Sequence, residues 1–155
     1  MNNKIDILIR NCIREAFIPY YGISYTGVRI EEPDEIHKLE DFFQKTIDQI
    51  SFIVPDNWKL PEDYHMTICL DELPLHLKMR GDLNSEVVLT ITHIGYNTKA
   101  IAFKVTGYMS KNEVQHITMR FLDKPADSKE IADWYPLKTG LELKGYIREV
   151  AKKQP

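Results

Sequence analysis

His65-Met66-Thr67-Ile68 and His116-Ile117-Thr118-Met119 are two copies of one pattern, in which His, an apolar residue, Thr and a second apolar residue follow one another. In a β-strand, alternate side chains point to the same face. Each copy therefore presents an imidazole and a hydroxyl on one face and two apolar side chains on the other. The pattern predicts that both motifs lie on strands, each with its apolar side in a core and its polar side in a site.

Two imidazoles and two hydroxyls that face each other supply the groups that phosphodiester cleavage needs. One His removes a proton, the other delivers a proton, and the hydroxyls bind phosphate oxygens. The competing interpretation makes each His an ordinary half-buried strand residue, and for a single copy it is the better one. His37, His76 and His93 do not fit the pattern. Because two of the five His do fit it, we favour a functional pair.

Hydrophobic periodicity and chain-breaking residues predict the remaining elements. Pro33, followed by two acidic residues, is typical of a helix start, and Asp127-Ser128 is typical of an N-terminal cap. In chain order we expect a helix over 3–17, a strand over 24–31, a helix from 33 to about 50, a loop over 55–63, the first motif strand over 64–70, a connection with at most a short element over 71–85, a hairpin of strands 86–96 and 99–108, the second motif strand over 114–121, a short helix from 127 to about 134, and a last strand over 140–149.

This order of elements predicts an α+β fold with mainly antiparallel sheets flanked by helices. The two matching motif strands lie well apart in the sequence, which suggests two lobes that face each other across a central groove. At 155 residues, the whole range 1–155 is expected to form a single domain with a sizeable core.

The composition favours a cytoplasmic globular protein. No apolar run is long enough to predict a transmembrane helix, and charged residues such as Asp6, Arg10 and Arg14 interrupt any signal-peptide core. Cys12 and Cys69 lack a CxxC spacing, so we expect buried thiols in a reducing compartment.

The charge and the motifs also narrow the ligands. A net charge of −3 disfavours a long nucleic acid, whose binding is usually driven by a basic field, and fits a small nucleotide better. His76 and His93 have no metal-ligand spacing, and Gly22 and Gly27 match no phosphate-binding loop. We therefore expect no metal, no other cofactor and no membrane partner, and the oligomeric state stays open.

Three further side chains are candidates for binding a substrate. Arg120 continues the alternation of the second motif, where a cation suits a phosphate; the alternative is a strand-end residue that reaches solvent. Tyr25 lies near the start of the strand over 24–31, and Trp134 in the turn before the last strand. Aromatic rings of this kind stack on nucleobases, although for any one of them a place in the core is the alternative.

With its paired motifs, the chain resembles the 2H phosphoesterase superfamily, which is named for two His-x-Thr/Ser motifs. The resemblance extends to the strand and helix before the first motif, and to Lys124-Pro125-Ala126-Asp127-Ser128 with a short helix and a closing strand after the second. By its length, its early Tyr-rich segment and the short link between its motifs, the chain looks most like the phage anti-CBASS phosphodiesterases. These enzymes degrade the cyclic di- and trinucleotide messengers of bacterial immunity.

The resemblance implies a metal-independent mechanism. One of His65 and His116 acts as general base and the other as general acid, while Thr67 and Thr118 donate hydrogen bonds to the non-bridging phosphate oxygens. Which His has which role stays open. The nucleophile is the 2′-hydroxyl of a cyclic 3′–5′ messenger, or water for a 2′,3′-cyclic phosphate.

The first functional hypothesis is thus a phosphodiesterase of small cyclic oligonucleotides that counteracts CBASS immunity in the host cytoplasm. The alternatives are a 2′,3′-cyclic phosphodiesterase of RNA end repair and a non-catalytic module that binds a nucleotide.

Overall fold

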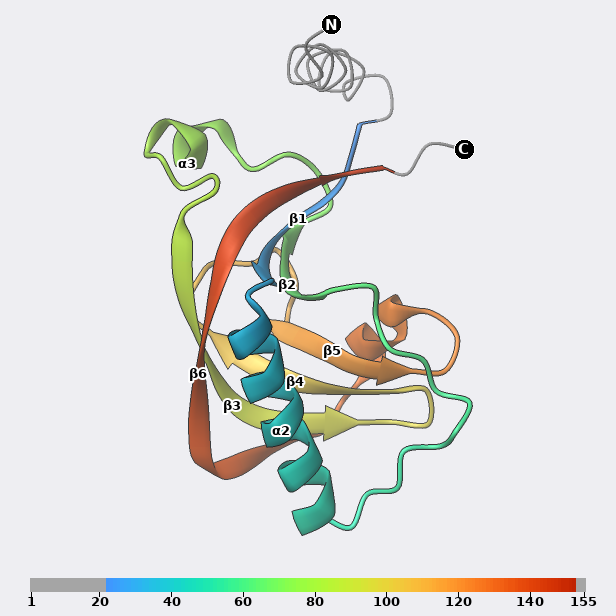
Figure 1. Cartoon of the computed structure of the whole chain (residues 1–155). Coiled ribbons are helices and arrows are strands. Elements are labelled where there is room, and N and C mark those ends of the chain that lie inside the picture. The colour runs from blue at the N-terminus through green and yellow to red at the C-terminus, as the bar shows by residue number, and fades with distance from the viewer. Residues whose placement is uncertain (1–21, 153–155) are drawn as a thin grey trace, which may run out of the picture.

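Six strands close into an antiparallel barrel in the computed structural model, which describes residues 22–152 (Figure 1). Around the barrel the strand order is β1-β2-β5-β4-β3-β6. The elements are β1 (Ile23–Ile30), α2 (Pro33–Gln49), β2 (Tyr64–Cys69), α3 (Leu75–Met79), β3 (Glu86–Tyr96), β4 (Ala100–Thr106), β5 (His116–Phe121), the 3₁₀ helix η1 (Pro125–Glu130) and β6 (Trp134–Ala151). The predicted α+β class is confirmed.

The two motif strands are neighbours in this barrel. β2 pairs with β5 directly through Met66 and Ile117, so the sheet is continuous between the motifs. The expected division into two lobes across a groove is therefore not confirmed.

Most predicted elements are confirmed within a few residues, among them both motif strands, the hairpin of β3 and β4, and the helix that begins at Pro33. The predicted helix over 3–17 lies outside the described residues, as does Cys12. Cys69 is a buried free thiol, as predicted.

The prediction for Asp127 and Ser128 was wrong in position. The short helix begins at Pro125 and ends at Glu130, so both residues lie inside it. Pro125 suits the first helical position because it needs no hydrogen-bond partner for a backbone N–H. Asp127 accepts a hydrogen bond of 3.5 Å from the backbone N–H of Lys124, and so reaches back to the start of the helix.

The last strand is longer than predicted, and Trp134 is its first residue rather than part of a turn. Trp134 pairs with Gly95 and Pro136 with His93 on β3. Among residues 22–152, this end of β6 has β3 as its only strand partner, since the pairs with β1 begin at Tyr146. A proline is tolerated here because one side of the strand needs no donor.

The helix α2 lies beside β4 (Figure 1) and packs its buried face against the hydrophobic core of the barrel. Its buried residues are Leu39, Phe43, Thr46 and Ile47. The ring of Phe43 meets that of Phe103 on β4 edge to face, at 5.9 Å. Such aromatic pairs stabilise a core beyond their buried area. Among residues 22–152, no helix is long and apolar enough to cross a membrane.

The pairing of β2 with β5 decides where the motif side chains point. Met66 and Ile117 are both fully buried, and residues directly opposite in an antiparallel pair share a face. Continued by one residue each way, this register sets His65 across from Thr118 and Thr67 across from His116. All four polar side chains therefore lie on the face opposite to the core.

Candidate active site

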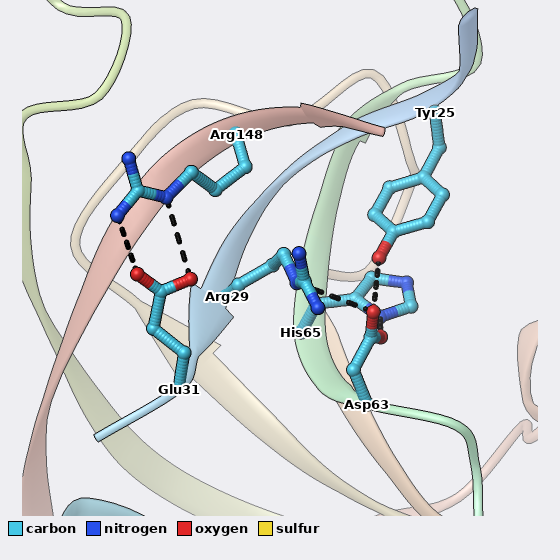
Figure 2. Close-up of polar contacts among 6 residues, drawn as sticks. All are labelled: Tyr25, Arg29, Glu31, Asp63, His65 and Arg148. Atoms are coloured by element: carbon cyan, nitrogen blue, oxygen red, sulfur yellow. Dashed lines mark hydrogen bonds and ion pairs between the residues drawn. The ribbon is translucent and has the colours of Figure 1, made fainter. Parts of the chain in front are cut away.

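His65 is held by a carboxylate and an aromatic ring (Figure 2). Its Nδ1 lies 2.6 Å from Oδ1 of Asp63, and the ring of Tyr25 stacks on the imidazole at 4.2 Å. The Tyr25 hydroxyl donates to Oδ2 of Asp63 at 2.7 Å, and Nε of Arg29 lies 3.2 Å from the same oxygen. A carboxylate can only accept, so Nδ1 carries a hydrogen and Nε2 faces away from Asp63.

This cluster keeps Asp63 ionised. Burial by itself would raise the pKa of Asp63, but the hydrogen bonds from His65 and Tyr25 and the charge of Arg29 lower it below its ordinary value. Burial and the bond to Asp63 raise the pKa of the Tyr25 hydroxyl. The hydroxyl of Tyr25 therefore stays a donor to a permanent carboxylate at neutral pH.

Gly27 on β1 leaves the space that Tyr25 occupies. A Cβ at this position would lie 3.2 Å from the Tyr25 ring and 2.8 Å from the carbonyl oxygen of Met66. Since real side chains essentially never come that close to a backbone oxygen, only glycine lets β1 lie this close to Met66 on β2, and its missing side chain also leaves room for the Tyr25 ring.

His116 has a different environment. The residue is 8% exposed, its Nδ1 lies 2.8 Å from the carbonyl oxygen of Val114, and its Nε2 lies 2.9 Å from Oγ of Ser128. The carbonyl requires the hydrogen on Nδ1. Burial lowers the pKa of His116, and the charges of His65 and Lys129 lower it further, against a smaller opposite effect of the bond to Val114.

Ser128 links the two polar residues of the second motif. Its Oγ is 2.7 Å from Oγ1 of Thr118 and 2.8 Å from the carbonyl oxygen of Pro125. The hydroxyl has one hydrogen, which it donates either to this carbonyl or to Nε2 of a neutral His116. The sequence analysis assigned Ser128 to a helix cap and missed this contact, because η1 returns to the face of β5 only in the folded barrel. The first motif has no equivalent: within the described residues, the Thr67 hydroxyl makes no hydrogen bond.

A pocket of about 420 Å³ opens beside His116, which is in the usual range for small-molecule sites. Its walls come from the connection before β5, from η1 and from the start of β6, and include Asn112, Lys129 and Trp134. The ring of Trp134 lies 6.2 Å from that of His116. Trp134 also packs on Gly95, where a Cβ would lie 2.6 Å from the indole.

Arg120 does not join the motif residues. Its guanidinium is 3.1 Å from the carboxylate of Glu40, donates to the Tyr64 hydroxyl at 2.9 Å and lies over the ring of Phe43. The register with β4 shifts between Thr118 and Arg120, so an extra residue breaks the alternation that the prediction assumed. Its alternative, a strand-end residue in solvent, does not describe it either, since the side chain is 16% exposed.

Other cations near the first motif are also paired. Figure 2 shows Arg29 on Asp63 and Arg148 on Glu31. In the pocket, Lys129 is exposed and close enough to His116 to affect its pKa. Residues 22–152 contain no group of three or more His, Cys, Asp or Glu side chains arranged to hold a metal ion.

The site thus brings together His65, Thr67, His116 and Thr118, with Tyr25 and Trp134 next to one imidazole each. It adds Asp63, Ser128 and Lys129, none of which the sequence analysis placed in the site. No protein-family model matches the chain, and no curated protein matches it. Its function has to be argued from this geometry.

Proposed function

We propose that this protein is a metal-independent phosphodiesterase that cleaves 3′–5′ bonds of small cyclic oligonucleotides. One observation carries the proposal: the two His-apolar-Thr motifs share one face of the paired strands β2 and β5, and the two imidazoles are close enough that charge on His65 lowers the pKa of His116. Two interacting imidazoles with different environments are what general acid–base catalysis requires.

The two imidazoles account for both proton transfers of the reaction. Thr67 and Thr118 lie on the same face and donate to the non-bridging oxygens, which stabilises the charge that develops there. Lys129 is the cation best placed to attract the phosphate, because it lines the pocket beside His116.

The surroundings support a small nucleotide as substrate. A pocket of about 420 Å³ accommodates a nucleoside rather than a long strand. Tyr25 and Trp134 place one aromatic ring beside each imidazole, and such rings bind bases with little sequence preference. An enzyme of this kind removes cyclic messengers, and by the resemblance of its motifs we propose that it counteracts CBASS immunity.

The test is chromatography of cyclic dinucleotides, cyclic trinucleotides and an RNA with a 2′,3′-cyclic phosphate end, each incubated with the full chain and EDTA. We expect ring opening of a cyclic substrate, and its loss in His65→Ala and in His116→Ala. His37→Ala, on the exposed side of α2, is the matched control and should keep full activity. Opening of the RNA end alone would assign the protein to RNA repair, and turnover of no substrate would contradict the proposal.

A further inference from the structure

The two imidazoles of the site differ in the group that accepts the hydrogen on Nδ1. For His65 the acceptor is the Asp63 carboxylate at 2.6 Å, which carries a full negative charge. For His116 it is the Val114 carbonyl at 2.8 Å, which is neutral. A charged acceptor stabilises an imidazolium, whereas a neutral acceptor in a buried place favours the neutral ring.

Exposure to solvent separates them in the same direction. His65 is only partly buried, whereas His116 is buried, so water also reaches the His65 ring. His116 is 8% exposed, and it faces the positive charge of Lys129 on η1 as well as that of His65 on β2. His65 therefore has the charged partner and the access to water that suit a proton donor, and His116 has the buried, uncharged surroundings that suit a base.

From these contacts we propose that His116 is the general base and His65 the general acid of the reaction, an assignment that rests on the function proposed above. Nε2 is the reacting atom of both rings, since Nδ1 is engaged in each. On His65, Nε2 makes no hydrogen bond to any of the residues 22–152, and its proton is available to a leaving group.

The reaction balances without a further reactant. Nε2 of His116 takes the proton of the substrate's 2′-hydroxyl, the 2′-oxygen forms a bond to phosphorus, and the bond from phosphorus to the 5′-oxygen breaks. Nε2 of His65 delivers its proton to that 5′-oxygen. The products are a 2′,3′-cyclic phosphate and a free 5′-hydroxyl, and proton exchange with water restores both rings.

Ser128 occupies the position of the attacking hydroxyl in the free protein. Its Oγ lies 2.9 Å from Nε2 of His116, at hydrogen-bond distance from the base. A substrate hydroxyl has to replace it there. After the exchange, the hydrogen that Ser128 donated to Nε2 turns to the carbonyl oxygen of Pro125 at 2.8 Å, so the hydroxyl stays satisfied.

The assignment also fixes the direction of the substrate. The nucleoside that carries the attacking 2′-hydroxyl lies on the side of His116, so its base enters the pocket with Trp134 and Lys129. The nucleoside that loses its bond to phosphorus lies on the side of His65, next to Tyr25.

A cyclic dinucleotide with sulfur in place of one bridging 5′-oxygen tests the assignment. A thiolate leaves without being protonated, so a missing general acid no longer matters. We expect His65→Ala to open the oxygen substrate about 10²- to 10⁴-fold more slowly than the wild type, but the sulfur substrate within about tenfold of it. His116→Ala should be slow on both. Asp63→Asn, which keeps the side-chain shape, should lose activity on the oxygen substrate and much less on the sulfur substrate.

If the sulfur substrate restores the rate of His116→Ala instead of that of His65→Ala, the two roles are reversed. If it restores neither rate, the assignment is overturned. Both results leave the proposed function intact. If the wild type opens neither substrate, the proposed function fails and the assignment fails with it. Far-UV circular dichroism of each variant, with His37→Ala as control, excludes misfolding. Asp63→Asn gives a second comparison of the oxygen and sulfur substrates, in a variant that keeps both imidazoles.

Discussion

The two motifs have the same sequence pattern and opposite surroundings. Beside the first, Asp63 and Arg29 surround a partly exposed His65 with charged partners. Beside the second, His116 is buried among uncharged hydrogen-bond partners, Ser128 and the Val114 carbonyl. The comparison teaches that the residues next to a repeated motif, here the loop before β2 and the helix η1, decide whether its imidazole has a charged or an uncharged hydrogen-bond partner.

The strongest test of the comparison removes both imidazoles. If the two sides serve one reaction, His65→Ala and His116→Ala each lower the rate of ring opening by about 10²- to 10⁴-fold. The double variant should then lose little more than the worse single variant, because groups that act as a unit are not additive. The measurement is the initial rate of ring opening by chromatography. If the rate of the double variant falls by the product of the two single fold-decreases, the two imidazoles act independently.

Ser128→Ala tests the uncharged surroundings of His116. It leaves the buried Nε2 of His116 and the hydroxyl of Thr118 without their partner, so we expect the free energy of unfolding to fall by about 1–3 kcal/mol. Turnover should change by less than about tenfold, since substrate displaces Ser128 from the base. Urea denaturation and initial rates check the two effects. Unchanged stability would contradict the contacts described for this side.

The pH dependence of stability separates the two sides, because their groups titrate in different windows. The folded pKa of His116 lies below its ordinary value of 6.5, so the unfolded chain binds the proton first and stability decreases as pH falls below 6.5. The folded pKa of Asp63 lies below 3.8, so its contribution persists down to about that pH and is lost below it. Urea denaturation between pH 7 and 5 should show a smaller decrease in His116→Gln than in the wild type. An equal decrease in His116→Gln and the wild type would be the contrary result.

Tyr25→Phe, in the charged cluster beside His65, has the smallest expected effect on the free energy of unfolding. The ring over His65 remains, and one hydrogen bond of 2.7 Å to Asp63 is lost. We expect a loss of about 0.5–1.5 kcal/mol in the free energy of unfolding, because Asp63 keeps His65 and Arg29 as partners. Urea denaturation measures it. A loss above that of Ser128→Ala would reverse the ranking of the two sides.

The sequence predicted both motif strands and the common face of their His and Thr, because a period of two is local information. Asp63 was within reach of the same reasoning, since Asp63, His65 and Thr67 alternate, but the strand was expected to begin after it. Arg120 was misplaced because the register shift beside it arises from pairing with β4. Ser128 required the return of η1 to β5, a tertiary contact that no periodicity encodes.

Closure of the barrel has a consequence for biosynthesis. The first described strand, β1, pairs with β6, as in the contact of Ile23 with Ala151, so the ring stays open until β6 has left the ribosome. Contacts between such distant segments slow folding. We expect nascent chains that already contain both motifs, but not β6, to lack activity.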